Sequence, residues 1–281
     1  MLNPDPVWFV NAFAADYFGG NTAAVVLLAD FPDDNRMLAL AKEFGFSETA
    51  FLKALAPARY HIRWFTPEVE VPLCGHATLA SARALFSGPD SGCGKLSFTS
   101  LSGELAATLK GDLIELDFPA ENSAACSVEP ALVEALGPHQ PRESLSARNS
   151  RNLVLVYAEH QQVLDLQPDF PRLAAMTGLP WLGIAVTAPC PEGYICRYFA
   201  PWEGINEDPV TGSAQTYLAP YWSAKLGLRV LNGWQASQRG GTFEVEISSA
   251  RVLIRGRAFL YLRGKIDSGW KTSPVQSPPG R

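Results

Sequence analysis

The chain has 281 residues, of which 47% are hydrophobic, 11% aromatic and 18% charged, and its formal net charge is -5. This composition is typical of a folded protein long enough for two medium-sized domains, and it excludes a disordered or fibrous chain. The negative charge and the absence of a dense Lys/Arg run argue against a nucleic-acid groove, because such a groove must neutralise many phosphates.

Strands and helices alternate along the first half of the chain. Apolar runs bounded by turn residues predict strands. Apolar residues at helical spacing, between an acidic start and Gly45, predict a helix over 33–44. After two prolines, small and apolar residues predict a buried helix over 75–86. The predicted strands cover 7–10, 23–28, 48–52, 60–65, 95–99 and 113–118.

An internal repeat relates the two halves. Both halves show the order strand, Pro-bearing loop, Gly turn, helix, and in both a further helix (33–44 or 170–177) precedes a further strand (48–52 or 183–187). Two motifs in the same order indicate a duplication. The paired motifs are Arg63-Trp64-Phe65-Thr66-Pro67 with Arg197-Tyr198-Phe199-Ala200-Pro201, and Pro72-Leu73-Cys74-Gly75-His76-Ala77 with Pro209-Val210-Thr211-Gly212-Ser213-Ala214.

The boundary between the halves falls in the Pro-, Glu- and Ser-bearing stretch 119–129. We predict an N-terminal domain over 1–118 and a C-terminal domain over 119–266. Residues 267–281 offer little to bury, so we expect a flexible tail there.

The cysteines and the N-terminal sequence indicate the cellular compartment of the protein. The five cysteines are odd in number and lack the paired short spacings of a zinc site, which favours reduced thiols. No run reaches the roughly eighteen apolar residues of a membrane helix, and the start lacks the order of a signal peptide. We therefore expect a cytoplasmic protein with small-molecule partners and no membrane. The cysteines are Cys74, Cys93, Cys126, Cys190 and Cys196.

Each repeat places a glycine, Gly75 or Gly212, at the predicted start of a helix. The backbone N–H groups there lack intrahelical partners, and the helix dipole contributes about half a positive charge. Glycine lets a ligand approach the backbone, so two such starts facing one cleft would bind a substrate carboxylate. Plain turn glycines are the simpler interpretation of either motif alone, but their duplication favours the anion site.

Three polar side chains stand beside these glycines. His76 can donate a hydrogen bond or carry a proton near neutral pH. Asp208 would hold a substrate amine or hydroxyl, or cap a turn. Ser213, at the position equivalent to His76, suits either a helix cap or contact with a carboxylate.

Glu48 lies among apolar and small residues in 46–51, where strand interiors disfavour glutamate. A carboxyl held in an apolar cleft has a raised pKa, as a group that takes and returns a proton near neutral pH requires. An outward-facing strand glutamate is the simpler interpretation of this fragment alone.

Cys74 precedes Gly75 at a helix start that favours the thiolate, which makes it a candidate nucleophile or acid/base. A two-thiol racemase needs an acid and a base on opposite faces of one carbon, however, and the repeat partner of Cys74 is Thr211, a far weaker acid. We therefore interpret Cys74 as a small neighbour of the site. The sequence contains no phosphate-loop, dinucleotide-binding, HExxH or Gly-x-Ser-x-Gly motif, so we expect neither a cofactor nor a metal.

Six motifs stand out as a set: Asn11-Ala12-Phe13, Gly20-Asn21, Ser47-Glu48-Thr49-Ala50-Phe51, Phe65-Thr66-Pro67, Cys74-Gly75-His76-Ala77-Thr78 and Glu207-Asp208-Pro209-Val210-Thr211-Gly212-Ser213-Ala214. Together they resemble the phenazine-biosynthesis isomerase family (PhzF-like proteins), within the broader diaminopimelate-epimerase-like fold, up to about Lys265. Asn11 departs from the aspartate usual in the first motif, and some relatives carry a non-thiol residue in place of Cys74.

The resemblance implies an α+β fold of two similar half-barrel domains. Each domain wraps a sheet around a central helix that begins near Gly75 or Gly212, the active site lies in the cleft between them, and the protein is commonly a homodimer. It further implies Glu48 as general acid/base, helped by His76, Asp208 and Ser213. The implied substrate-binding residues are Asn21, Cys74, Gly75, Thr211 and Gly212.

We therefore expect a cofactor-independent isomerase that moves a proton through Glu48 on a small carboxylate-bearing substrate. In the best-understood members of the family the substrate is trans-2,3-dihydro-3-hydroxyanthranilate. Two alternatives stay open. One is a cofactor-independent amino-acid racemase or epimerase that uses Cys74, and the other is a non-catalytic small-carboxylate binding protein.

Overall fold

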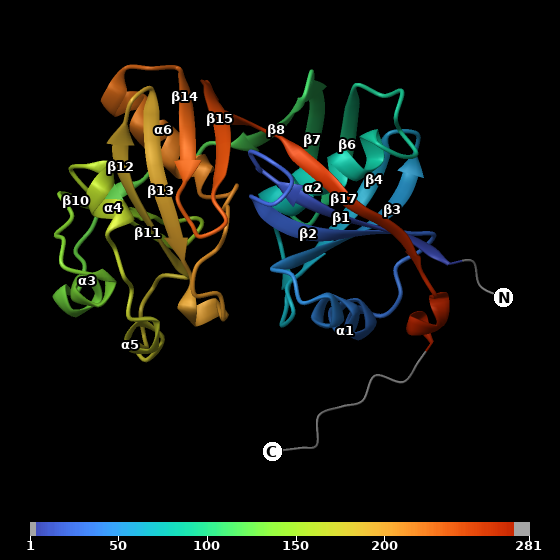
Figure 1. Ribbon diagram of the computed structural model, residues 1–281, viewed down its shortest axis with the longest axis horizontal. Helices are drawn as coiled ribbons and strands as arrows, with labels where there is room; N and C mark the ends of the chain where they lie inside the picture. The colour runs from blue at the N-terminus through green and yellow to red at the C-terminus, as the bar shows by residue number, and fades with distance from the viewer. Residues whose placement is uncertain (1–3, 273–281) are drawn as a thin grey trace, which may run out of the picture. The chain divides into compact units, whose positions relative to one another are not determined.

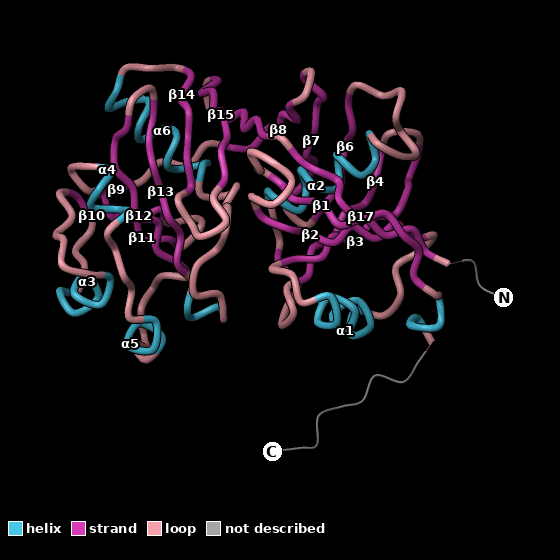
Figure 2. Tube along the Cα trace, in the orientation of Figure 1, coloured by secondary structure: helices cyan, strands magenta, loops and turns pink. Residues whose placement is uncertain are grey.

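The computed structural model describes residues 4–272, and the chain divides into two compact units (Figure 1). Within the described range, unit 1 comprises 4–12, 22–116 and 257–272, whereas unit 2 comprises 13–21 and 117–256. Strands dominate both units and helices are few (Figure 2). The predicted α+β class is confirmed.

A sheet surrounds the helix α2 in unit 1. Every α2 residue except Arg83 is buried, and α2 packs against β1, β3, β7 and β17. Its many alanines let the strands approach closely on all sides, so the predicted buried helix over 75–86 is confirmed. The elements are β1 (Asp5–Ala12), β2 (Asn21–Leu28), α1 (Asp34–Phe44), β3 (Glu48–Ala56), β4 (Arg59–Phe65), β5 (Glu70–Val71), α2 (Gly75–Phe86), β6 (Lys95–Ser100), β7 (Gly103–Lys110), β8 (Leu113–Pro119), which contains the unit boundary, β17 (Ala258–Ile266) and the 3₁₀ turn η2 (Ser268–Lys271).

The helix α1 has a clear start and end signal. The Asp33 carboxylate accepts a hydrogen bond from the Asn35 N–H at 3.0 Å, and Gly45 ends the helix in the left-handed conformation at φ 67°. Met37 and Ala41 of α1 share an apolar cluster with Phe51 of β3. Since β3 packs against both α1 and α2, it is buried along 49–52. Its first residue, Glu48, is thereby fixed in place.

In unit 2 the helix α6 takes the place that α2 has in unit 1. It packs against β13, β14, β15 and β16, while the shorter helices α3, α4 and α5 contribute to a separate apolar cluster with β11, β12 and β13. The elements are β9 (Ala124–Ala125), α3 (Pro130–Leu136), β10 (Glu143–Ala147), β11 (Asn152–Val156), α4 (His160–Leu164), α5 (Phe170–Ala174), β12 (Gly183–Cys190), β13 (Gly193–Phe199), the 3₁₀ turn η1 (Pro201–Glu203), α6 (Gln215–Leu226), β14 (Val230–Gln235), β15 (Gly241–Ser248) and β16 (Arg251–Gly256).

Strand pairing repeats between the units. In unit 1, β2 pairs parallel with β3, β3 antiparallel with β4, β4 parallel with β6, and β6 antiparallel with β7. In unit 2, β11 pairs parallel with β12, β12 antiparallel with β13, β13 parallel with β14, and β14 antiparallel with β15. The central helices α2 and α6 follow equivalent strands, β4 with the short β5, and β13. The two units therefore share one topology, as the sequence repeat predicts.

Two helices differ from their predicted limits. The second central helix begins at Gln215 rather than near Gly212, because residues 211–216 first form a turn in which Gly212 and Ser213 carbonyls accept from amides three residues on. The helix predicted over 170–177 ends at Ala174.

The C-terminal strand departs from the predicted domain over 119–266. β17 pairs antiparallel with β1 along its whole length, from Asp5 opposite Ile266 to Ala12 opposite Ala258, and so belongs to unit 1. In return, residues 13–21 belong to unit 2, where Gly20 N–H donates to the Gly240 carbonyl. Unlike the predicted boundaries, both units are therefore discontinuous in sequence.

The first residues of the predicted flexible tail form the 3₁₀ turn η2. The Asp267 carboxylate caps η2, and within η2 the Lys271 ammonium lies 2.7 Å from the Asp5 carboxylate of β1. The remainder of the predicted tail, 273–281, lies outside the described residues.

Among the helices between residues 4 and 272, none is both long and apolar enough to cross a bilayer.

Candidate active site

Glu48 begins β3 directly after the turn that follows α1. Pairing with β2 sets it opposite Ala23. Its side chain is only 14% exposed, and the carboxylate atom Oε2 is buried. The glutamate is therefore turned inward, and the interpretation as an outward-facing strand residue is wrong.

Cys74, Gly75 and His76 form the start of α2. Cys74 is the N-cap, with extended backbone angles of φ -141° and ψ 113°, and its carbonyl accepts hydrogen bonds from the Thr78 N–H at 3.2 Å and hydroxyl at 2.6 Å. These two bonds hold the first turn of the helix. Both flanking side chains, Cys74 and His76, are buried.

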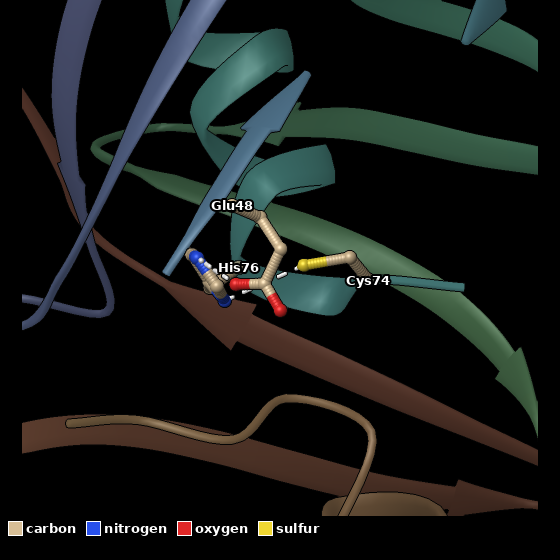
Figure 3. A group of neighbouring side chains, drawn as sticks. All are labelled: Glu48, Cys74 and His76. Atoms are coloured by element: carbon tan, nitrogen blue, oxygen red, sulfur yellow. Dashed lines mark hydrogen bonds and ion pairs between the residues drawn. The ribbon is translucent and has the colours of Figure 1, made fainter. Parts of the chain in front are cut away.

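The side chains of Glu48, Cys74 and His76 converge (Figure 3). His76 Nε2 lies 3.2 Å from Glu48 Oε2, and His76 Nδ1 lies 3.5 Å from Cys74 Sγ. The hydroxyl of Ser47 lies 3.4 Å from the same Nε2. Three of the residues that the sequence singles out thus lie in contact, with His76 between the other two.

Burial governs the charge of His76. Removing the imidazolium from water disfavours its charged form and lowers the pKa of His76 to about 3. At neutral pH the ring is therefore neutral, and its 3.2 Å contact with Glu48 joins a neutral ring to a carboxyl group rather than forming an ion pair.

The donor set raises the question of a metal ion, since one ligand atom from each of the three residues lies within 4.8 Å of the others. The two short contacts, however, leave from opposite nitrogens of His76. A metal bound by Cys74 and Glu48 would have to use a single ring nitrogen. The contacts therefore match a metal centre poorly.

Asp208 anchors a second polar cluster, in unit 2. Its carboxylate accepts from Asn21 Nδ2 at 2.8 Å and from the Thr211 hydroxyl at 2.5 Å, and Asn21 also donates to the Val210 carbonyl at 3.0 Å. Asn21 lies 187 positions away along the chain. The structure thus groups three more of the predicted site residues around one carboxylate.

Asp208 is 8% exposed, and burial raises its pKa to about 6. The hydrogen bonds from Thr211 and Asn21 oppose the shift because they stabilise the ionised form. Asp208 therefore titrates much closer to neutral pH than an exposed aspartate.

Gln235 of β14 braces this cluster and was missed by the sequence analysis. Fully buried, its amide oxygen accepts from the Thr211 N–H at 2.8 Å, and its amide nitrogen donates to the Asp208 carbonyl at 2.8 Å. Gln215, another buried residue, donates to the Thr211 carbonyl at 3.0 Å. A strand glutamine carries no local signal of such a role, because its partners lie far away in sequence.

Gly212 and Ser213 lie in the turn that precedes α6. Ser213 is half-buried, and its carbonyl accepts from both the N–H and the hydroxyl of Thr216, at 3.1 and 2.7 Å. These bonds fix the backbone of the turn.

Comparison with known proteins identifies the family. The family model for phenazine biosynthesis-like proteins matches residues 10–264. The chain belongs to this family. An uncharacterized isomerase of Pseudomonas aeruginosa is 42% identical over 261 residues, covering 92% of this chain and 98% of the relative. The resemblance inferred from the six motifs is confirmed.

Solved structures agree with the assignment. A PhzF-family phenazine biosynthesis protein from Enterococcus faecalis is 39% identical and covers 94% of this chain and 100% of its own, with a TM-score of 0.86. A probable proline racemase from Agrobacterium radiobacter, 12% identical, covers 94% of this chain and 93% of its own with a TM-score of 0.61. The latter likeness shows the fold alone.

Proposed function

We propose that the protein is an isomerase that moves a proton on a small carboxylate-bearing substrate, with Glu48 as the general acid and base. Its Pseudomonas aeruginosa relative is named an isomerase, which supports the reaction class. The substrate is a small acid of the dihydro-hydroxyanthranilate type, with a carbon acidified by a neighbouring unsaturated group.

The contact between Glu48 and His76 carries this proposal. A charged histidine would hold Glu48 in a permanent ion pair and make it a weak base. The neutral, buried imidazole instead lies 3.2 Å from Oε2, so it is a polar neighbour of the carboxyl group that adds no compensating charge. A carboxylate in such a setting can both take up a proton and release it.

The reaction follows from this geometry. Because Oε2 faces His76, we assign proton transfer to Oε1. This oxygen takes the proton from one substrate carbon, and the electron pair of the broken C–H bond shifts into the adjacent unsaturated system. The carboxylic acid exchanges its proton with solvent and then delivers a proton to a second carbon, with a new C–H bond at that carbon. No electrons are gained or lost, so the step requires only a proton carrier.

The remaining predicted residues take supporting roles in this proposal. Amide N–H groups at the start of α2, next to Gly75, bind the substrate carboxylate. Asp208 and Ser213 stay proposed catalytic residues. Asn21 and Thr211, expected to bind substrate, both donate to Asp208, and we therefore assign them to holding that carboxylate.

Hydrogen–deuterium exchange tests the role of Glu48. Wild type and Glu48→Gln are incubated in D₂O with dihydro-hydroxyanthranilate and a panel of amino and hydroxy acids, and deuterium at carbon is measured by NMR and mass spectrometry. We expect wild type to incorporate deuterium and the variant to lose at least about 100-fold in rate. Glu43→Gln, at an exposed position of α1, is the matched control and should exchange like wild type.

The same experiment distinguishes the alternatives. Exchange that survives Glu48→Gln but is abolished by Cys74→Ala would contradict the proposal and favour a thiol racemase. Tight binding of a carboxylate without exchange in any ligand would favour a binding protein.

A further inference from the structure

Gln235 of β14 contacts three atoms of the motif 208–211 in unit 2. Its amide oxygen accepts from the Thr211 N–H at 2.8 Å, whereas its amide nitrogen donates to the Asp208 carbonyl at 2.8 Å and lies 3.2 Å from the Thr211 hydroxyl oxygen. An N–H group can only donate and a carbonyl can only accept, so the two backbone partners fix which end of the amide is which. The second amide hydrogen of Gln235 therefore faces the Thr211 hydroxyl oxygen.

The Thr211 hydroxyl can donate or accept, and its neighbours determine which it does. The Gln235 amide nitrogen is a donor only, so the hydroxyl oxygen accepts from it. The hydroxyl hydrogen is then directed to Asp208 Oδ2, 2.5 Å away. On the other carboxylate oxygen, Oδ1, Asn21 Nδ2 donates at 2.8 Å, and the same nitrogen donates to the Val210 carbonyl. Each oxygen of Asp208 thus receives a hydrogen bond that favours the ionised form.

We propose that Gln235 is a positioning residue that holds the Thr211 hydroxyl against Asp208 as a donor and so keeps Asp208 ionised in its buried setting. Gln235 bonds to the backbone carbonyl of Asp208, so its effect on the carboxylate runs through Thr211. This effect stands on the contacts alone. Its consequence for the reaction rests on the proposed function, in which Asp208 is a catalytic residue.

The other ionisable groups around Asp208 do not supply this stabilisation. Burial raises the pKa of Asp208, two side-chain hydrogen bonds lower it, and the charge of Glu207 raises it further. Glu207 is itself paired with Arg197 at 2.8 Å. The Cys196 thiol lies 3.9 Å from the Gln235 amide oxygen, but burial raises the pKa of this thiol to about 12, so it is neutral. Ionisation of Asp208 therefore depends on its hydrogen bonds.

Gln215 of α6 provides a matched comparison. Like Gln235 it is fully buried, and it also donates to Thr211, but to the backbone carbonyl at 3.0 Å rather than to the hydroxyl. If Gln235 served only to hold the backbone of Thr211, the loss of either glutamine would affect Asp208 alike. The proposal instead predicts an effect on Asp208 from the loss of Gln235 alone.

The pKa of Asp208 tests the inference. It is measured by ¹³C NMR of aspartate-labelled protein, with the Asp208 signal assigned by Asp208→Asn. We expect Thr211→Val and Gln235→Met each to raise this pKa by about 1, the effect of one lost hydrogen bond to a charged group. Thr211→Ser, which keeps the hydroxyl, and Gln215→Met should leave it at about 6. The double variant of Thr211→Val and Gln235→Met should match Thr211→Val alone, because the hydroxyl through which Gln235 acts is already absent.

Three results would overturn the inference. They are an unchanged Asp208 pKa in Gln235→Met, equal increases in Gln235→Met and Gln215→Met, and increases that add in the double variant. Thermal unfolding of each variant shows that the protein is folded when the titration is recorded. If Gln235→Met does not fold, the wild type supplies the test. Its Gln235 side-chain amide signals should shift with the Asp208 midpoint, and signals that stay fixed through that midpoint would contradict the coupling.

Exchange rates connect Asp208 to the reaction. In the deuterium assay, the acid limb of the pH–rate profile of Gln235→Met should move to higher pH by the same amount as the Asp208 pKa, and a limb that stays in place would overturn the catalytic consequence. A raised Asp208 pKa in Gln235→Met with Glu48→Gln still active would leave the positioning role standing and contradict the proposed function. An inactive Glu48→Gln with an unchanged Asp208 pKa in Gln235→Met would do the reverse.

Discussion

At the scale of single residues, burial produces opposite effects on two site side chains. It disfavours the charged form of any ionisable group, so it lowers the pKa of His76 to about 3 and raises that of Asp208 to about 6. One group is thereby kept neutral at physiological pH, and the other is brought into the range where it can exchange protons.

Asp208 should leave a signature in the pH dependence of stability. Its folded-state pKa of about 6 exceeds the ordinary aspartate value of 3.8, so the folded state binds more protons between these values and stability falls as pH rises. The free energy of unfolding of wild type, relative to Asp208→Asn, should therefore decrease by about 2 kcal/mol between pH 4 and pH 7. Urea unfolding at several pH values measures this difference.

The slope of the free energy of unfolding against pH distinguishes the titration of Asp208 from the loss of its hydrogen bonds. In Asp208→Asn the new amide cannot accept from both Asn21 and Thr211 as the carboxylate does, but that loss is nearly independent of pH. Asp112→Asn, at an exposed turn, should follow wild type at every pH. A wild-type curve parallel to that of Asp208→Asn would contradict the assignment.

The identity of the site residues could be predicted from short motifs, but their partners could not. Glu48, Cys74 and His76 converge as the motifs indicate. The amide of Asn21 binds Asp208 across 187 positions, a contact that only the folded topology creates. Gln235 was missed for the same reason.

At the scale of elements, the sequence repeat corresponds to a repeated ion pair. Arg63 binds Glu70 through Nε and a terminal nitrogen, at 2.7 and 2.6 Å, and Arg197 binds Glu207 in the same way, at 2.8 and 3.1 Å. Each guanidinium also lies about 5 Å from the ring of the phenylalanine two residues on. Each pair closes the loop that leads from a strand toward a central helix.

The stability contributed by the Arg197–Glu207 pair should depend on the two parallel hydrogen bonds of the guanidinium rather than on its charge alone. Arg197→Lys keeps the charge but loses the two parallel hydrogen bonds and the ring contact, and both side chains are largely buried. We expect a loss of about 2 kcal/mol in the free energy of unfolding, measured by chemical denaturation.

The matched control is Arg172→Lys. Arg172 pairs with Glu134 on the surface, where the two side chains are 45% and 61% exposed, and a change there should stay within about 0.5 kcal/mol. Equal losses of unfolding free energy in the two variants would show that the paired hydrogen bonds of Arg197 add no stability beyond that of a surface ion pair.

The repeat predicts the order of elements better than their ends. The first central helix begins at Gly75 as expected, but the second begins at Gln215, after a turn braced by Gln235 and Gln215. These two glutamines belong to a strand and a helix that follow the motif 209–214, so the motif alone does not predict their hydrogen bonds. The strand order, in contrast, follows from the duplication.

At the scale of the whole molecule, the pairing of β17 with β1 places the ends of the described chain close together. Asp5 lies opposite Ile266, and its carboxylate accepts from the Lys271 ammonium at 2.7 Å and the Trp270 ring N–H at 3.2 Å. The sequence predicted two domains in simple succession, because the residues of a strand do not reveal which other strand it pairs with. Unit 1 is instead completed by the last segment of the described chain.

This closure predicts that the chain tolerates circular permutation. A permutant that joins Thr272 to Pro4 through a short Gly/Ser linker and opens between Asn122 and Ser123, where Asn122 is exposed, keeps every strand intact. We expect it to unfold cooperatively, with a midpoint within about 5 °C of wild type by circular dichroism. A chain that ends at Gly256 instead lacks β17 and exposes the edge of β1, so it should aggregate or lose the cooperative transition. A permutant without cooperative unfolding, or a truncated chain as stable as wild type, would contradict the conclusion that β17 completes unit 1.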